Sequence, residues 1–159
     1  MEHLEIERKF LVTSDAYRQE ATSQTRIAQG YLNTDPDRTV RVRIMGEKGF
    51  LTIKGGPNDS GTTRFEWEIE ISTLEATNLI DLCNTGILEK YRYEVPMGKH
   101  FFEVDEFLGE NKGLVIAEVE LNHEDEKFEK PEWLGEEVTG QKQYYNSQLS
   151  KNPFNTWKQ

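Results

Sequence analysis

The stretch RFEWEIEI, residues 64–71, alternates charged and apolar side chains without interruption. One side of it is apolar, and the other carries Glu66, Glu68 and Glu70. A period of two predicts a β-strand with one buried face, because successive side chains of a strand point to opposite sides. Three carboxylates on one face repel one another, so this face needs a counter-charge or a cation nearby.

The same alternation recurs along most of the chain, between short turns rich in Gly, Asp and Asn. It predicts strands at Leu4–Val12, Thr39–Ile44, Phe50–Lys54, Arg64–Ile71, Ile87–Val95, His100–Phe107 and Leu114–Leu121. An apolar-rich stretch between turns, Thr25–Asn33, is added as an eighth strand. Several of the connections are short, so we expect neighbouring strands to be antiparallel.

Three short helices are predicted outside these strands. They are Asp15–Glu20 with Ser14 as N-cap, Leu74–Cys83 with Thr73 as N-cap and Gly86 beyond its end, and Lys142–Ser150. The loop Gly55–Thr63, with the sequence GGPNDSGTT, is expected to be flexible. No internal repeat or linker divides the chain, so we expect residues 1–159 to form a single domain.

The polar faces of the predicted strands are sorted by charge. Glu5 and Glu7 share one face, and Arg41 and Arg43 share another, whereas Lys and Glu are usually interspersed on solvated faces. A solvated surface would explain any single strand, but the sorted set favours faces that converge on a common interior. A sheet closed to about eight strands can hold a small ligand. We therefore predict a mainly β fold, an eight-stranded antiparallel β-barrel that forms a charged tunnel, with a few outer helices.

Such a tunnel would combine two kinds of side chain. The acidic ones are Glu5, Glu7, Glu66, Glu68, Glu103, Asp105, Glu118 and Glu120, and the basic ones are Lys9, Arg41, Arg43, Lys54, Lys90 and Arg92. Carboxylates without His or Cys prefer hard cations, here Mg²⁺ or Mn²⁺. Enclosed Arg and Lys prefer a polyanion. The chemistry that needs both is metal-assisted phosphoryl transfer from a short polyphosphate.

The motifs and their order resemble the CYTH family of triphosphate tunnel metalloenzymes. The N-terminal EIERK matches the ExExK signature of that family. The resemblance continues through IAQGYL, TVRVRI, FLTIK, RFEWEIEI, KYRYEV, EVDEFLG, GLVIAEVEL and WLGEEVT, which together span residues 27–139. It implies the eight-stranded antiparallel tunnel that the alternation also predicts.

The resemblance also implies roles for individual residues. The metal-binding carboxylates would be Glu5, Glu7, Asp105, Glu118 and Glu120. The phosphate ligands would be Lys9, Arg41, Arg43, Lys54, Lys90 and Arg92. The catalytic candidates would be Lys9, Glu66, Glu68 and Tyr31. Whether Glu66 and Glu68 hold a second metal or orient water is left open, as is whether Tyr31 faces the lumen or packs beside Leu32.

The function that these residues predict is a divalent-metal-dependent triphosphatase, which cleaves a phosphoanhydride bond of inorganic tripolyphosphate or a related linear triphosphate. The family resemblance also leaves open an adenylyl cyclase or a thiamine triphosphatase. A non-catalytic module that binds polyphosphate or nucleotide is a third alternative. The complete set of acidic positions disfavours it, because a binder could dispense with metal ligands.

Composition restricts the partners. The net charge of −10 argues against nucleic acid and against an anionic membrane, and the mean hydropathy of −0.76 leaves no membrane-spanning helix. The single cysteine, Cys83, and the lack of a secretory signal pattern predict a cytoplasmic protein. The sequence does not determine the oligomeric state and leaves a homodimer open. The lumen residues carry two more acids than bases, which predicts that triphosphate binds poorly without a divalent cation.

Overall fold

The structure, a computed structural model, describes residues 3–83 and 86–157, and this part of the chain contains nine strands. They are β1 (Leu4–Val12), β2 (Ser23–Asn33), β3 (Arg38–Met45), β4 (Lys48–Gly55), β5 (Thr63–Ile71), β6 (Leu88–Met97), β7 (His100–Phe107), β8 (Val115–Glu120) and β9 (Leu134–Glu137). The first eight match the predicted strands to within two residues at each end. The short β9 has no counterpart among the predictions.

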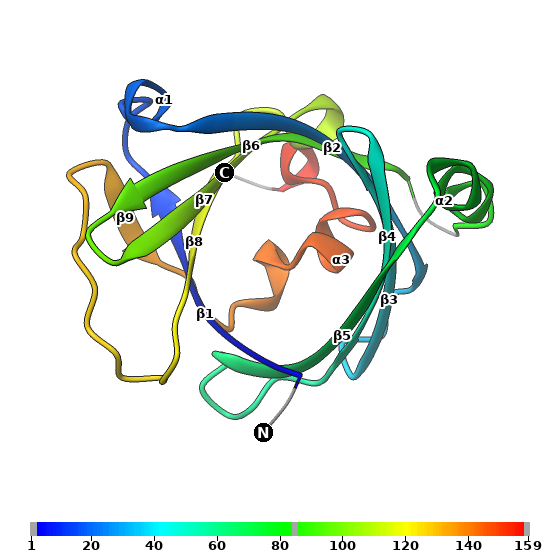
Figure 1. Ribbon diagram of the computed structural model, residues 1–159, viewed down its shortest axis with the longest axis horizontal. Coiled ribbons are helices and arrows are strands. Elements are labelled where there is room, and N and C mark those ends of the chain that lie inside the picture. Colours follow the sequence, from blue (N-terminus) through cyan, green and yellow to red (C-terminus); the bar gives the residue numbers. More distant parts are fainter. Residues whose placement is uncertain (1–2, 84–85, 158–159) are drawn as a thin grey trace.

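All the strand pairs are antiparallel, and the sheet closes on itself (Figure 1). The order is β5-β4-β3-β2-β6-β7-β8-β1-β9, and a further pairing of β1 with β5 completes an eight-stranded barrel. The predicted mainly β barrel is therefore confirmed. The pairing of β1 with β5 is short, from Leu4 to Ile6, and β9 takes over the same edge of β1 from Phe10.

The main apolar core lies outside the barrel wall, because the lumen is charged. It forms where the outer faces of β1, β6, β7 and β8 are covered by the short helix α1 (Tyr17–Glu20) and by the segment between β8 and β9. Its buried members include Phe10, Tyr17, Phe102, Val119 and Trp133. The prediction that helices cover the outer face is therefore correct only in part, since Trp133 comes from an irregular segment.

The helix α2 (Thr73–Ile80) covers the other side of the barrel, against β2, β3 and β4. Its N-cap is Ser72, in a capping box with Glu75, so the prediction of Thr73 is wrong by one residue. Gly49 on β4 permits the close approach of Ala76, because a Cβ at Gly49 would lie 2.8 Å from the Ala76 methyl group. No helix of the described residues is long and apolar enough to cross a membrane.

The first predicted helix needs correction at its N-terminal end, and the last one is interrupted in the middle. The first helix starts at Tyr17, and Ser14 is not its N-cap, because Ala16 occupies that place without a side-chain cap. The predicted helix Lys142–Ser150 is broken at Tyr145, which has extended backbone dihedral angles. It consists of the 3₁₀ turn η2 (Lys142–Tyr144) and the single-turn helix α3 (Asn146–Leu149).

The C-terminal segment fills one end of the barrel. Figure 1 shows α3 within the outline of the strands. Its Leu149 is fully buried, and it packs with the inward residues Leu88, Phe107 and Ile116 and with Leu114. The 3₁₀ turns η1 (Gly109–Asn111) and η3 (Phe154–Thr156) contact each other beside this cluster. The lumen is thus covered at one end, a feature that the strand pattern could not predict.

The loop predicted to be flexible is tied down in the structure. Glu124 accepts hydrogen bonds from Asn58, Ser60, Thr62 and Thr63, at 2.7–3.2 Å. The loop glycine Gly61 lies against Gly140, where an added Cβ would come within 2.4 Å of the Gly140 Cα. The loop is therefore a fixed part of the wall beside β1 rather than a solvated linker.

Candidate functional site

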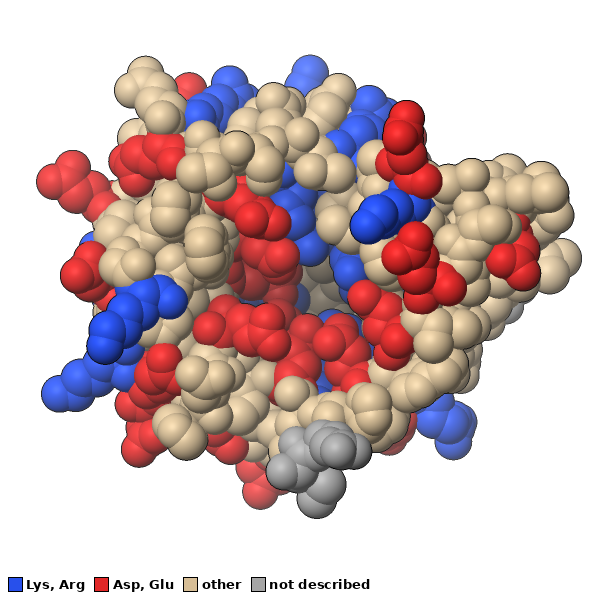
Figure 2. Space-filling view, in the orientation of Figure 1, with Lys and Arg blue, Asp and Glu red and all other residues tan. Residues whose placement is uncertain are grey.

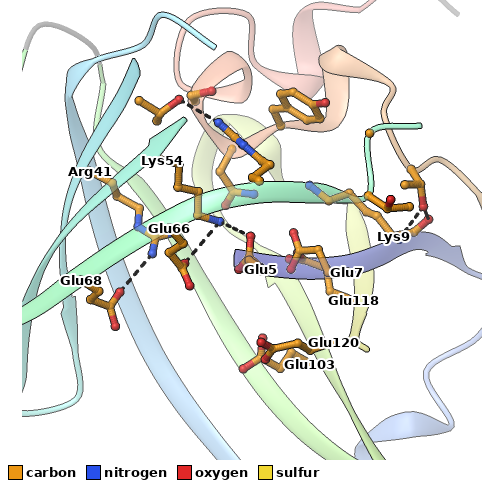
Figure 3. Close-up of a pocket in the computed structure, with 18 of the residues that line it drawn as sticks. Glu5, Glu7, Lys9, Arg41, Lys54, Glu66, Glu68, Glu103, Glu118 and Glu120 are labelled. Carbon is orange, nitrogen blue, oxygen red and sulfur yellow. Dashed lines mark hydrogen bonds and ion pairs between the residues drawn. The ribbon is translucent and has the colours of Figure 1, made fainter. Parts of the chain in front are cut away.

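The inward side chains of the barrel surround a cavity of about 200 Å³. Figure 2 shows acidic side chains gathered around a hollow, with basic side chains deeper in it. The cavity is lined by almost all of the predicted site residues, namely Glu5, Glu7, Lys9, Tyr31, Arg41, Arg43, Lys54, Glu66, Glu68, Lys90, Arg92, Glu118 and Glu120 (Figure 3). Asp105 is fully buried behind this lining.

The strand register explains why residues far apart in sequence meet here. On β1 the inward positions are Glu5, Glu7 and Lys9, as their alternation predicts. In the pairing of β1 with β8, Glu7 lies opposite Glu120 and Lys9 lies opposite Glu118. Directly opposed residues of antiparallel strands have Cβ atoms about 5 Å apart, so their side chains interact. The acidic signature of β1 and the two glutamates of β8 therefore form one cluster.

Glu7 and Glu118 are two half-buried carboxyl groups that interact directly and influence each other's pKa. Burial, together with repulsion from Glu118 and Glu5, raises the pKa of Glu7 well above its ordinary value. Burial opposes ionisation of Glu118 as well, but Lys9, the hydrogen bond from Glu7, Arg92 and Lys90 outweigh it and lower its pKa. Of the two, Glu7 therefore holds a proton more readily than Glu118. A cation placed between them would displace this proton.

Lys54 joins β4 to the acidic cluster. Its Nζ donates to Glu5 Oε1 at 2.9 Å and lies 3.7 Å from Glu66 Oε2. Burial raises the pKa of Glu5, but the attraction and hydrogen bond of Lys54 outweigh burial and lower it overall. Burial and the charge of Glu5 raise the pKa of Glu66. The two carboxylates beside Lys54 therefore differ in their readiness to take a proton.

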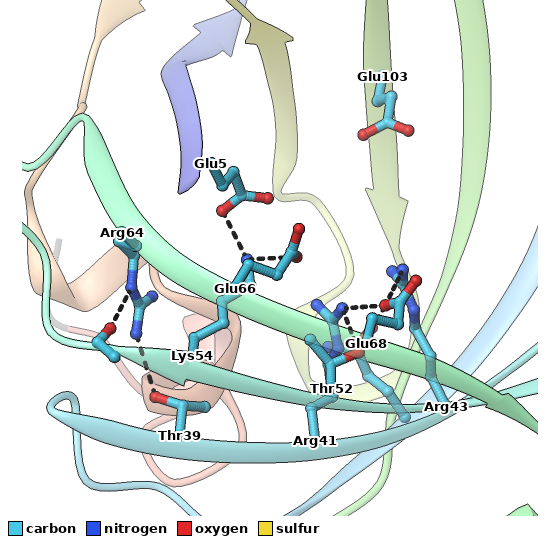
Figure 4. A network of polar contacts seen from close by, with 12 residues as sticks. Glu5, Thr39, Arg41, Arg43, Thr52, Lys54, Arg64, Glu66, Glu68 and Glu103 are labelled. Atoms are coloured by element: carbon cyan, nitrogen blue, oxygen red, sulfur yellow. Dashed lines mark hydrogen bonds and ion pairs between the residues drawn. The ribbon is translucent and has the colours of Figure 1, made fainter. Parts of the chain in front are cut away.

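Two arginines of β3 converge on one glutamate of β5 (Figure 4). Glu68 Oε2 accepts from Thr52 at 2.6 Å, from Arg43 at 3.3 Å and from Arg41 at 3.5 Å. Burial and the nearby charges of Arg41 and Arg92 lower the pKa of Arg43 to about 10. The Nε atoms of both arginines are buried without a hydrogen-bond partner among the described residues. Such donors usually mark a place for an unseen acceptor.

Asp105 anchors the basic residues of β6. Arg92 donates to both of its oxygens at 2.8 and 2.9 Å, and Lys90 Nζ lies 2.8 Å from Oδ2. Burial and the charge of Arg92 lower the pKa of Lys90 to about 8. Glu103 Oε2 lies 3.4 Å from Arg92 Nη1 on the side of the cavity. Both oxygens of Asp105 are therefore engaged by cations of the protein itself.

The covered end of the cavity is basic and aromatic. The ring of Tyr145 has Lys9 Nζ 5.3 Å from its centroid and the guanidinium carbon of Arg64 5.6 Å from it. Arg64 is held in place by hydrogen bonds to Thr39 and to the carbonyl oxygens of Gly55 and Pro36. These cation–π contacts position two cationic groups at the covered end of the cavity without neutralising their charge.

Tyr31 faces the lumen rather than the outer core. Its side chain is buried, it lines the cavity, and its hydroxyl oxygen accepts a hydrogen bond from Gln29 Nε2 at 2.8 Å. Gln29 is itself fully buried, and its Oε1 has no partner among the described residues. Of the two placements left open for Tyr31, the structure thus shows the lumen.

Glu103 lines the cavity, as predicted for the tunnel, and the structure adds Arg64, Tyr145 and Asn146 to the candidate site. Arg64 lies in phase with the predicted residues Glu66 and Glu68 of its own strand, so the alternation contained its signal. Tyr145 and Asn146 line it from the C-terminal segment, where no strand period exists. Their position depends on how the end of the chain folds back into the barrel.

The acidic cluster has the right ligand atoms for a hard divalent cation, but its side chains are not arranged around a common point. Oxygen atoms of Glu5, Glu7, Glu118 and Glu120 are the ligands that Mg²⁺ and Mn²⁺ prefer, and His and Cys are absent from the lining. Among residues 3–83 and 86–157 no three acidic, histidine or cysteine side chains are already arranged to hold a metal ion. Binding would require these carboxylates to turn toward a common point.

A closed antiparallel barrel with acidic and basic side chains sorted around one lumen defines a class of protein with an enclosed site for a charged ligand. Within that class, the chain belongs to the CYTH domain family, and the sequence model of this family matches residues 3–153. The family resemblance seen in the motifs is therefore confirmed.

Relatives and solved structures agree with this assignment. The chain is 47% identical over 156 residues to a protein of Acetivibrio thermocellus named inorganic triphosphatase, and 98% of each chain is covered. It is 37% identical over 151 residues to an inorganic triphosphatase of Nitrosomonas europaea, with 92% of this chain and 96% of the relative covered. The crystal structure of an inorganic triphosphatase aligns with a TM-score of 0.65 at 34% identity, covering 92% of this chain and 93% of the other.

Proposed function

We propose that this protein hydrolyses a phosphoanhydride bond of a linear triphosphate, with inorganic tripolyphosphate as the main substrate. The observation that carries the proposal is the lumen, in which six predicted basic side chains and an acidic cluster surround one cavity. Two relatives that align over nearly the full chain are named inorganic triphosphatase. The site therefore provides the chemistry that this activity needs.

The basic side chains would bind the phosphate oxygens. Arg41 and Arg43 each keep a buried Nε donor without a partner among the described residues, and a phosphate oxygen would satisfy it. Lys54, Lys90 and Arg92 would add positive charge from the neighbouring strands β4 and β6. Because Asp105 already holds Lys90 and Arg92, we assign it the role of positioning these cations rather than that of a metal ligand.

The acidic cluster would bind Mg²⁺ or Mn²⁺, and triphosphatases of the CYTH family generally depend on divalent metals. Glu7 and Glu118 would be the main ligands, with Glu5 and Glu120 beside them. When bound, the cation offsets negative charge on the phosphate oxygens. A proton held by Glu7 would leave as the cation binds, so metal affinity should increase with pH.

Glu66 is the better candidate than Glu68 for orienting the attacking water. Glu68 already accepts hydrogen bonds from Thr52, Arg41 and Arg43, which restrict its carboxylate. Glu66 has only the distant contact with Lys54, and burial raises its pKa toward the range useful for a base. Lys9, close to the covered end, would stabilise charge on the phosphate, and Tyr31 retains its hydroxyl proton for donation.

The size of the cavity favours tripolyphosphate over a nucleotide held entirely inside the barrel. Its volume of about 200 Å³ is below the roughly 300–1,000 Å³ of pockets that enclose drug-sized molecules. An adenylyl cyclase or a thiamine triphosphatase would have to leave the organic group outside the lumen. A module that only binds polyphosphate would not need the paired carboxyl groups of Glu7 and Glu118.

A substrate panel tests the proposal. Purified protein is incubated with tripolyphosphate, pyrophosphate, ATP or thiamine triphosphate in the presence of Mg²⁺ or Mn²⁺, and phosphate and cyclic AMP are measured. We expect the highest kcat/KM with tripolyphosphate. Cyclic AMP formed faster than phosphate would identify a cyclase, and binding without turnover under every condition would identify a binding module.

A further inference from the structure

Asn146 reaches the cavity from the covered end. It is the first residue of α3, its side chain is half-buried, and it lines the cavity together with Tyr145 and Ser147. It belongs to none of the strands that supply the rest of the charged lumen. The cationic groups of Lys9 and Arg64 lie on the ring of the neighbouring Tyr145. The amide group of Asn146 is thus placed at the covered end of the cavity, close to two positively charged side chains.

Two donors fix the orientation of this amide. Lys90 Nζ lies 2.8 Å from Asn146 Oδ1, and Gln29 Nε2 lies 3.4 Å from the same oxygen. A lysine ammonium group can only donate, so it requires the carbonyl oxygen of the amide and not its nitrogen. Gln29 in turn is oriented by its hydrogen bond to Tyr31. The amide cannot flip without placing donor against donor.

This orientation leaves the Nδ2 group of Asn146 as an uncommitted donor. No side chain or carbonyl of the described residues accepts a hydrogen bond from it, and the residue borders the cavity. The covered end of the cavity therefore presents a neutral NH₂ group beside Lys90, with Lys9 and Arg64 nearby. An NH₂ donor surrounded by cationic groups is well placed to bind an anionic oxygen of a ligand.

We propose that Asn146 is a substrate-binding residue that recognises the terminal phosphoryl group at the covered end of the lumen. Its Nδ2 donates to a non-bridging oxygen of that group, while its Oδ1 holds Lys90. The inference rests on the proposed function, and it makes the enzyme select a chain end that carries no organic substituent. A nucleoside or thiamine group would then have to lie at the opposite, acidic end of the cavity.

The substitution Asn146→Asp separates the two roles of this side chain. Aspartate has the same shape and still accepts from Lys90, but it replaces the NH₂ donor with a carboxylate oxygen that repels phosphate. A hydrogen bond to a charged group corresponds to a factor of about ten or more in binding. We therefore expect the KM for tripolyphosphate to increase at least about tenfold, with a smaller change in kcat. The exposed Asn155, changed to Asp, adds the same charge outside the lumen and should leave both constants unchanged.

Asn146→Ala completes the comparison, because it removes the contact with Lys90 as well as the donor. If Asn146→Ala impairs the enzyme and Asn146→Asp does not, the residue only orients Lys90 and the proposal is wrong. Circular dichroism checks that each variant is folded. Calorimetric titration with tripolyphosphate, without turnover, gives a second measurement: weaker binding by Asn146→Asp supports the proposal even if the wild type is not a hydrolase, and unchanged binding refutes it.

Discussion

At the residue scale, the site depends on neighbouring groups of one chemical type that have different protonation states. Glu7 and Glu118 are both half-buried, yet the pKa of Glu7 is raised and that of Glu118 is lowered. The difference arises because the charges of Lys9, Arg92 and Lys90 lower the pKa of Glu118, whereas repulsion from Glu118 and Glu5 raises the pKa of Glu7. Two neighbouring carboxyl groups with opposite pKa shifts are expected of a site that exchanges a proton for a cation.

Glu7 should therefore contribute to stability in a pH-dependent way. Because its pKa is raised in the folded protein, its contribution is complete below the ordinary value of 4.5 and is lost as the pH rises through the raised value. Glu7→Gln stays neutral at every pH. Between pH 5 and pH 9 its free energy of unfolding, measured with urea, should fall less than that of the wild type by about 1 kcal/mol or more. Parallel pH profiles would show that Glu7 is not protonated in the folded state.

Arg41 should be required for turnover rather than for folding. Its Nε has no partner among the described residues and its side chain faces the cavity, so Arg41→Ala should lower kcat/KM at least a hundredfold while the circular dichroism spectrum stays native. Arg38, on the same strand, is exposed and pairs with Asp35, so Arg38→Ala is the matched control and should be active. An unfolded Arg41→Ala would instead identify a structural ion pair with Glu68.

At the element scale, the alternation of side chains predicted the strands and their inward faces. The period of two assigned Glu5, Glu7 and Lys9 to one side of β1 before any pairing was known, and the register of β1 with β8 agrees. The phase of a strand depends only on local geometry, so a single sequence contains it. The same logic places Glu103 of β7 in the lumen, as predicted, and extends to Arg64, which lies in phase on β5.

The elements that the sequence did not predict depend on contacts between distant segments. The four-residue β9 exists because Phe10 and Val12 offer a free edge of β1 after β5 has diverged. The last predicted helix breaks at Tyr145, whose ring lies between Lys9 and Arg64. Local helix propensity cannot anticipate either event, because tertiary packing overrides it.

The loop between β4 and β5 provides a test at the same scale. Glu124 accepts four side-chain hydrogen bonds from this loop, and the loop in turn holds β1 through the bond from Glu7 N–H to the Thr62 carbonyl oxygen. Glu124→Ala should make residues 56–63 several-fold more susceptible to limited proteolysis and should lower the turnover rate. The neighbouring Asp125, which is exposed, is the control when changed to Ala. Unchanged cleavage would mean that the backbone alone holds the loop.

At the scale of the whole molecule, the location of charge matters more than its sum. The chain has a net charge of −10, yet the basic side chains of the lumen lie together inside an acidic outline (Figure 2). An anion that enters from the side seen in Figure 2 passes the acidic side chains around the hollow before it reaches the basic side chains deeper in it. A divalent cation that neutralises the acidic cluster would remove this barrier. The net charge thus predicts a requirement for metal rather than the absence of a phosphate ligand.

The rate of phosphate release from tripolyphosphate, measured as Mg²⁺ or Mn²⁺ is added to protein treated with EDTA, tests the central claim most directly. We expect no measurable release without a divalent cation, saturable activation by at least one of the two ions, and loss of that activation in Glu7→Gln. Release that proceeds equally well in EDTA, or that Glu7→Gln supports at the rate of the wild type, would contradict the account of a metal-dependent triphosphatase site in the lumen.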